Sequence, residues 1–261
     1  ATYRDDDQVY DVLGELGEEM LPGYDYLVVW KDLYTVYGGE TDWLYAGMGI
    51  MPFVNELYTS YNMFHNESSG FLGSREEVYR FDELLLFGDA VVDWHTVEHP
   101  DYGEVEIGGL KKNSIRVPPS FLLEEEAHRN MAFTLWHAYH LPALEIEDVK
   151  INRIAGNRYE VNASVMNHRA IPTRLQVDVE NSITRPDWIS LEGADVITGG
   201  VRDRYVDETF SIQEHNPERI NVSHIPGNSA VHVTWIVDGN GPFTINVNSL
   251  KGGNVNEQVS P

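Results

Sequence analysis

The sequence predicts a mixed α/β portion followed by an all-β antiparallel sandwich. Two observations support this division, and both fall near Pro142. Helical spacing and continuous apolar runs give way there to short alternating segments. The charge changes as well, since residues 1–141 carry 26 acidic and 8 basic residues and residues 142–261 carry 16 and 10. We therefore expect domains at 1–141 and 142–250, and a loose polar tail at 251–261.

The first portion contains three predicted helices. Apolar residues recur at helical spacing over 6–20, and the acidic start of this segment suits the positive end of a helix dipole. Ser74 and Glu77 form a capping-box pattern, which predicts a helix over 74–89. A third and longer helix is predicted to follow Pro119 and to end before Pro142.

Extended structure is expected between these helices. The apolar runs at 26–30 and 49–57 are short and bounded by Gly and Pro, a pattern typical of buried strands. Residues 94–112 alternate in short stretches punctuated by Gly and Pro, which predicts a hairpin within a loop. The first portion should therefore mix helices with buried strands.

The second portion shows repeated alternation of apolar and polar residues, separated by turn sequences. This pattern predicts an antiparallel β-sandwich of about 105 residues. The predicted strands are 159–167, 174–181, 208–213, 219–225, 230–239 and 243–249. No catalytic pattern is evident in this portion.

Composition excludes several classes of function. The chain has 261 residues, 42% of them apolar, which is enough to fill a core. It has no cysteine, so disulfides, thiolate catalysis and cysteine-type zinc sites are excluded. The net charge of −24 disfavours nucleic acid and anionic membranes as partners. No apolar run approaches the roughly 18 residues that a membrane span needs.

One stretch carries a specific motif. Tyr34-Thr35-Val36-Tyr37-Gly38-Gly39-Glu40-Thr41-Asp42-Trp43-Leu44-Tyr45 is followed by an apolar run to Phe53, Glu56 and Leu57. In order and separation this segment resembles the C-terminal active-site segment of zinc carboxypeptidases of the carboxypeptidase A type. The similarity extends more loosely through residue 141, toward a bacterial branch with a β-rich C-terminal domain. The resemblance implies that residues 1–141 are the C-terminal part of a carboxypeptidase-like mixed-sheet domain.

The resemblance implies a role for three residues. Glu56 corresponds to the general base, Tyr34 to the mobile lid tyrosine that binds substrate, and Thr41 to the floor of the side-chain pocket. A small polar residue at that floor favours an apolar or mixed substrate side chain. The structural alternatives are a Glu56 paired with a cation or backbone amides, and a Tyr34 that is an ordinary loop tyrosine.

The zinc ligands of the family have no counterpart at the expected place. In the family they precede the lid tyrosine, in sequence that this chain does not contain, so zinc is expected in the parent enzyme and no cofactor is expected for this chain alone. His95-Thr96-Val97-Glu98 has the spacing of a ligand pair but follows Glu56 in a predicted loop. We interpret this pair, and the histidines at 224 and 232, as surface or hydrogen-bonded residues, and those at 128, 137 and 140 as ordinary residues of an amphipathic helix.

Two functions remain open at this point. In the first, the chain is the C-terminal portion of a secreted, cell-surface or periplasmic metallocarboxypeptidase that acts on peptide C-termini, and is inactive alone. In the second, it is a non-catalytic structural or binding protein whose sandwich mediates assembly or attachment. On the first hypothesis, the missing N-terminal half or a second copy of the chain is a further expected partner.

Overall fold

The computed structural model describes residues 3–58 and 74–261. The chain forms two compact units. The first, here called the sandwich unit, comprises the N-terminal residues up to Val12, Val36–Phe53 and Trp136–Pro261. The second, the helical unit, comprises Leu13–Thr35 and Val54–Leu135. Two long helices, α1 (Arg4–Met20) and α5 (Ser120–Tyr139), each contribute residues to both units.

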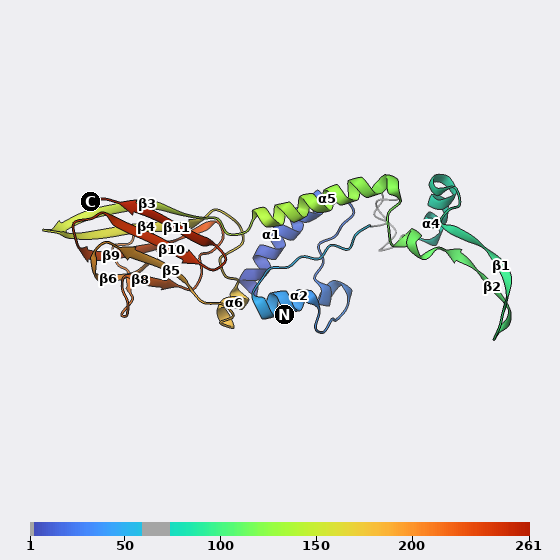
Figure 1. Ribbon diagram of the computed structural model, residues 1–261, viewed down its shortest axis with the longest axis horizontal. Coiled ribbons are helices and arrows are strands. Elements are labelled where there is room, and N and C mark those ends of the chain that lie inside the picture. The colour runs from blue at the N-terminus through green and yellow to red at the C-terminus, as the bar shows by residue number, and fades with distance from the viewer. Residues whose placement is uncertain (1–2, 59–73) are drawn as a thin grey trace. The chain divides into compact units, whose positions relative to one another are not determined.

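The sandwich unit contains two antiparallel sheets, drawn in yellow to red in Figure 1. The five-stranded sheet has the order β3-β4-β9-β6-β7, and the four-stranded sheet has the order β11-β10-β5-β8. The strands are β3 (Leu144–Ala155), β4 (Arg158–Asn167), β5 (Asp187–Glu192), β6 (Asp195–Arg202), β7 (Ser211–Ile212), β8 (Arg219–Val222), β9 (Ser229–Asp238), β10 (Phe243–Ser249) and β11 (Gly253–Val259). The predicted antiparallel β-sandwich is thus confirmed.

The core of the sandwich unit lies between the two sheets. Trp235 of β9 and Phe243 of β10 are fully buried there, and alternate residues of the neighbouring strands pack around them. This alternation follows from the two-residue period of a strand, which sends successive side chains to opposite faces. The largest buried members besides these two are Val161, Val165, Ile189, Ile220, Ile225, Val233, Val237, Ile245 and Val247.

Two expectations for residues 142–261 are wrong. Residues 174–181 were expected to form a strand, but they contain the short helix α6 (Gln176–Glu180), whose first amides are bound by the distant carboxylate of Asp6. Residues 251–261 were expected to be loose, but Gly253–Val259 pairs with β10 along its whole length. The polar side chains of this strand suit an edge position, where one backbone side stays unpaired.

The segment Val36–Phe53 belongs to the sandwich unit and contains short helical turns. They are α2 (Glu40–Asp42) and the π-helical turn η2 (Trp43–Gly47). The expected strand over 49–57 is wrong, because none of these residues joins a ladder in the structure. A strand needs a hydrogen-bonded neighbour, and among the described residues this segment has none.

The helical unit contains the third predicted helix, α5, and the capped one. Helix α4 (Arg75–Phe81) begins with the predicted capping box, in which Ser74 and Glu77 bind each other's backbone amides. A π-helical turn, η3 (Asp82–Leu86), continues α4 and ends at Phe87 and Gly88, both with positive φ. The helix predicted over 6–20 is also confirmed, as α1.

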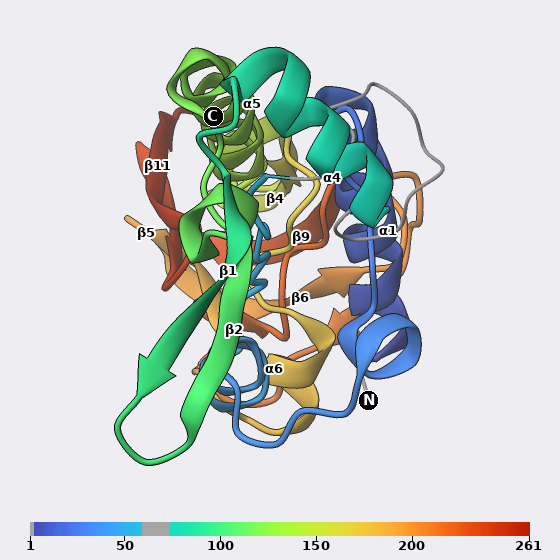
Figure 2. The same ribbon diagram turned by 90° about the vertical axis from the view of Figure 1, so that its right-hand side faces the viewer.

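The remaining elements of the helical unit are a hairpin and two short turns. The predicted hairpin is confirmed as the antiparallel pair β1 (Val91–His99) and β2 (Gly103–Leu110), the green ribbon in Figure 2. The turns are η1 (Val29–Leu33) and η4 (Lys112–Ile115). The strand expected over 26–30 is wrong, since part of it is the π-helical turn η1.

The mixed sheet expected for residues 1–141 is not confirmed. In the part of this portion that the structure describes, β1 and β2 are the strands, and they form an isolated ribbon. No helix of the described residues is long and apolar enough to cross a membrane.

Candidate functional site

Glu56 lies on a stretch of chain that is fixed on both sides by hydrogen bonds to α5. Before it, Asn55 Nδ2 donates to Asn130 Oδ1 at 2.8 Å. After it, the amide of Tyr58 donates to Glu126 Oε1 at 3.1 Å. Glu56 itself is exposed and has no hydrogen bond or ion pair with any described residue. Its neighbours are therefore anchored while its carboxylate stays accessible.

The anchor of this stretch is the buried carboxylate of Glu126, which is 4% exposed. It accepts hydrogen bonds from the hydroxyl of Tyr24 and from Asn130 Nδ2, the latter at 3.0 Å, in addition to the Tyr58 amide. Burial raises the pKa of Tyr24 to about 12, and the hydrogen bond to Glu126 adds to this. Burial likewise raises the pKa of Tyr58 to about 12, with the charge of Glu126 contributing.

Sequence reasoning missed this cluster. The first turns of α5 hold Glu124, Glu125 and Glu126, which the sequence presents alike as acidic residues at a helix start. Only Glu126 is buried, because it lies on the face of α5 that meets Tyr24 and Tyr58. The sequence feature that could have indicated this cluster is Asn130, which lies four residues after Glu126 and so on the same face of the helix.

Tyr34 follows the turn η1, where its amide donates to the carbonyl of Val29 at 2.9 Å. Its side chain is 67% exposed. No hydrogen bond joins it to Glu56 in the described structure. An open hollow of about 440 Å³ beside α4 has neither residue in its lining, which consists of Glu76, Tyr79, Arg80, Glu83 and Leu84. The hollow beside α4 is therefore not a cavity shared by Tyr34 and Glu56.

Thr41 lies in α2, within the sandwich unit, and is half-buried. Gly38, just before it, has a φ of +75°, a conformation that favours glycine. Tyr34 and Glu56 belong to the helical unit, so the structure does not bring Thr41 together with them in one unit.

The segment containing Thr41 is held on the sandwich by a buried carboxylate. Asp178 of α6 is fully buried and pairs with Arg174 Nη2 at 3.2 Å and with Lys251 Nζ at 2.8 Å. The same Lys251 ammonium donates to the carbonyl of Gly49. Burial alone raises the pKa of Asp178, but hydrogen bonds from Lys251 and Thr184 outweigh it, and the net effect is a lowered pKa.

A second buried carboxylate ties α1 to the same region. Asp6 is 1% exposed and accepts from the amides of Gln176 and Val177, at 2.6 and 3.0 Å. The hydroxyl of Tyr45 donates to it at 2.7 Å. Burial raises the pKa of Tyr45, and Asp6 adds to this. These contacts explain why the residues around 3–12 and 36–53 belong to the sandwich unit.

The histidines considered as ligands are dispersed. His95 Nδ1 lies 2.9 Å from the carbonyl of Asp93. His232 Nδ1 lies 2.8 Å from Ser164 Oγ and His224 Nδ1 lies 3.1 Å from Ser223 Oγ, and burial lowers the pKa of both histidines. Burial also lowers the pKa of His137 and His140 on α5. None of these, nor His128 or Glu98, belongs to a three-residue group with metal-ligand spacing among the described residues.

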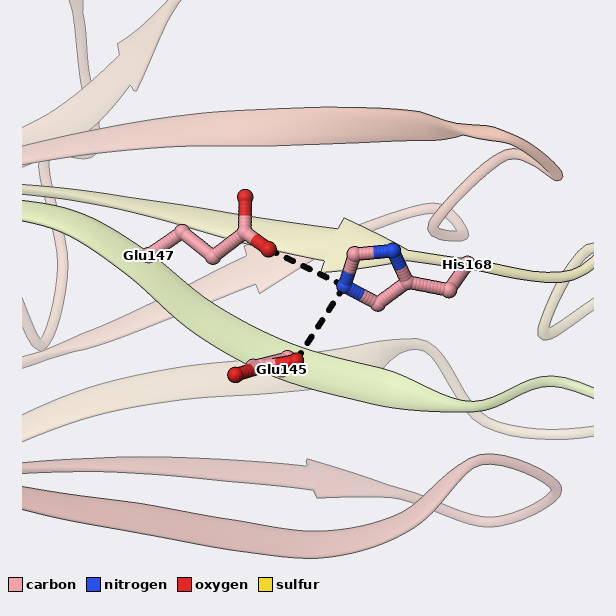
Figure 3. A group of neighbouring side chains, drawn as sticks. All are labelled: Glu145, Glu147 and His168. Atoms are coloured by element: carbon pink, nitrogen blue, oxygen red, sulfur yellow. Dashed lines mark ion pairs between the residues drawn. The ribbon is translucent and has the colours of Figure 1, made fainter.

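One such group does occur, and the sequence analysis did not single it out. Glu145, Glu147 and His168 gather at one end of the five-stranded sheet, as Figure 3 shows. The ring nitrogen His168 Nε2 lies 3.3 Å from Glu145 Oε2 and 3.0 Å from Glu147 Oε1. The alternation Glu-x-Glu in a strand, which places both carboxylates on one face, was the signal for it.

Comparison with known proteins adds little about function. Residues 143–260 match a family model described as a domain of unknown function (DUF8731), which covers less than half of the chain. No curated protein matches the chain.

The solved structures with some similarity are distant. A GH3 β-glucosidase of Bifidobacterium adolescentis is 11% identical, with 45% of this chain and 17% of that chain covered and a TM-score of 0.20. The yeast GGA1 GAE domain is 12% identical, with coverages of 46% and 89% and a TM-score of 0.18. DesR, a β-glucosidase from Streptomyces venezuelae in complex with D-glucose, is 11% identical, with coverages of 45% and 15% and a TM-score of 0.20. At such TM-scores none of them bears on function, and the chain spans less than a fifth of the length of either glucosidase.

Proposed function

We propose that this chain is the C-terminal portion of a secreted, cell-surface or periplasmic zinc metallocarboxypeptidase, and that Glu56 is its general base. The order and spacing of the motif from Tyr34 to Glu56 support this proposal. One structural observation carries it further. The side chain of Asn55 and the backbone amide of Tyr58 are hydrogen-bonded to α5, while the carboxylate of Glu56 between them is exposed and unpaired among the described residues.

This arrangement suits a base. A general base needs a carboxylate oxygen free to come within about 2.6–3.2 Å of the proton that it takes. A Glu56 sealed in an ion pair would have argued against the proposal. The exposed hydroxyl of Tyr34 is available to bind the terminal carboxylate of a peptide once its loop closes. Thr41 provides no charge, which fits an apolar or mixed substrate side chain.

Within the helical unit, to which Glu56 belongs, the described residues form no three-residue group with metal-ligand spacing. The three-residue group with metal-ligand spacing, Glu145, Glu147 and His168, belongs to the sandwich unit, whereas Glu56 belongs to the helical unit. We propose that the catalytic zinc of the parent enzyme is bound by residues other than the described ones of the helical unit. The chain alone is expected to be inactive on peptides, because the described residues of the helical unit offer no metal-ligand group to activate a water beside Glu56.

The test uses a longer protein that includes the coding sequence upstream of Ala1. We expect a His-x-x-Glu pair and a later histidine in that sequence, and hydrolysis of N-blocked dipeptides by the longer protein but not by the 261-residue chain. Tyr34→Phe should raise KM more than it lowers kcat. An upstream sequence without these ligands, or an inactive longer protein that is folded and zinc-loaded, would refute the proposal.

The alternative is a non-catalytic structural or binding protein, with the sandwich mediating assembly or attachment. The observation that favours it is that Tyr34 and Glu56 make no hydrogen bond to each other in the described structure and that Thr41 lies in the other unit. In that case Glu56→Gln should leave the unfolding free energy and the oligomeric state unchanged, since the carboxylate is exposed and makes no hydrogen bond or ion pair with any described residue.

A further inference from the structure

The group formed by Glu145, Glu147 and His168 has a definite origin in the sheet. Glu145 and Glu147 lie two residues apart on β3, so their side chains share one face of the strand. The neighbouring strand β4 ends at Asn167, and the pairing continues for one more residue because the amide of His168 donates to the carbonyl of Ala143 at 3.0 Å. His168 is thereby placed opposite the start of β3, within reach of both carboxylates.

The backbone beneath the group is fixed. The side chain of Asn167 is fully buried, accepts from the amide of Ala143 at 3.1 Å and donates to the carbonyl of Ile171 at 2.9 Å. Directly after Glu147 the ladder has a register shift, and Asp148 has a φ of +53°. The three side chains thus start from positions set by the sheet rather than from a free loop.

The distances between the ligand atoms fit a bound cation. Two atoms bound to one ion at about 2.1 Å, with an angle of 90–110°, lie about 3.0–3.4 Å apart. The two distances from His168 Nε2 to the carboxylate oxygens, 3.0 and 3.3 Å, fall within this range. Figure 3 shows both carboxylates directed at the same ring nitrogen, which a single N–H can serve only as a shared hydrogen bond.

The net negative charge of the group also favours a bound cation. Among the described residues, both carboxylates form their ion pair with the same imidazole, that of His168. Arg169, the adjacent cation, is engaged elsewhere, with its guanidinium 3.7 Å from the ring centroid of Tyr139. A protonated His168 leaves one negative charge uncompensated, whereas a neutral His168 with a divalent cation leaves none. In a chain of net charge −24 this difference favours the cation.

We propose that Glu145, Glu147 and His168 bind a divalent transition-metal ion, with zinc as the probe of choice. An imidazole nitrogen selects zinc and its neighbours over calcium and magnesium, which prefer all-oxygen sites. The site offers three protein ligands, and the exposure of the side chains leaves further positions for water. The inference does not depend on the proposed peptidase function, and it revises the expectation that this chain alone takes up no metal.

The test measures zinc bound to the whole 261-residue chain by equilibrium dialysis with metal analysis. The variants are His168→Ala and the isosteric Glu147→Gln, and the matched control is His95→Ala, which removes an exposed histidine of the helical unit near Glu98. We expect the wild type and His95→Ala to hold one zinc ion that the two site variants bind about tenfold more weakly or worse. Calcium and magnesium should not compete at equal concentration. Binding should weaken in acid, where protons compete for the imidazole.

A second measurement keeps the proposal testable if a variant unfolds. In the wild type, nitrogen-15 NMR of the histidine rings should show the Nε2 resonance of His168 shifting on addition of zinc, at neutral pH. Zinc uptake that is equal in His168→Ala and wild type would overturn the proposal. So would a His168 resonance that responds to acid alone and not to zinc, because the group would then be a simple ion pair.

Discussion

Replacing Asp178 by alanine should destabilise the sandwich unit strongly. The substitution removes the carboxylate that pairs with Arg174 and Lys251, and the side chain of Arg174 is only 4% exposed, so a guanidinium stays buried with one partner fewer. Breaking a buried ion pair from one side costs about 3–5 kcal/mol. Arg174 keeps hydrogen bonds to the carbonyls of Ser223 and Thr184, so we expect the lower end, about 3 kcal/mol.

The assay is urea unfolding followed by tryptophan fluorescence, to which the buried Trp235 of the sandwich unit contributes, with Asp207→Ala as the matched control. Asp207 also pairs with an arginine, at 2.8 Å, but that arginine is 77% exposed. An exposed pair contributes about 0–1 kcal/mol, so the control should change little. A loss of less than about 1 kcal/mol for Asp178→Ala, or equal losses in the two variants, would refute the reasoning.

The contribution of Asp178 should also depend on pH in a fixed direction. Its pKa is lowered in the folded protein, so the stabilisation is fully present above the ordinary aspartate pKa of about 4 and is lost as the pH falls through the lowered value. The difference in unfolding free energy between wild type and Asp178→Ala should therefore be constant near neutral pH and shrink below about pH 4.

Three further outcomes are expected. Asp6→Ala should cost about 2 kcal/mol of sandwich stability, because two amides of α6 and the hydroxyl of Tyr45 lose their acceptor, and urea unfolding measures it; an unchanged midpoint would contradict the assigned cap. Tyr24→Phe should cost about 1.5–3 kcal/mol in the helical unit, since the hydroxyl donates to a buried carboxylate, and it should remove one late step from the alkaline absorbance titration; loss of a step near the ordinary tyrosine pKa of about 10 instead would exclude the raised pKa. Ser74→Ala should cost about 1 kcal/mol through loss of the cap, seen as faster hydrogen exchange confined to α4; uniform acceleration across the unit would be inconsistent with a local cap.

Local patterns in the sequence were sufficient where the fold is decided locally. Ser74 and Glu77 satisfy each other's amides within one turn, so the start of α4 could be predicted from four residues. The alternation over 230–239 likewise predicts β9, because one face of that strand is buried against the opposite sheet.

Long-range contacts explain the errors. Residues 174–181 alternate as a strand would, but the carboxylate of Asp6, about 170 positions earlier, supplies the acceptor that caps α6. The C-terminal strand β11 has too few apolar residues to be recognised from pattern, and it forms because β10 offers a free edge.

The candidate sites show the same limit. The similarity of the segment from Tyr34 to Glu56 to a known motif rests on residue order and spacing alone. The hydrogen bonds of Asn55 and Tyr58 could not be predicted, because their acceptors, Asn130 and Glu126, lie on the distant helix α5. The Glu-x-Glu alternation of β3 was not singled out, although it places two carboxylates on one face of the strand. Which histidine lies beside them depended on the pairing of β3 with β4.

The central claim is that Glu56 is a catalytic base, and the most direct test is the kcat of the longer parent protein carrying Glu56→Gln. The matched control is Glu124→Gln, an exposed glutamate on α5. Because Glu56 is exposed and makes no hydrogen bond or ion pair with any described residue, its replacement should leave the unfolding free energy within about 0.5 kcal/mol of wild type. We predict that kcat for peptide hydrolysis falls by about 10²–10⁴-fold in Glu56→Gln and stays unchanged in Glu124→Gln, with zinc content equal in all three proteins. A Glu56→Gln protein that is folded, zinc-loaded and as active as wild type would contradict the account.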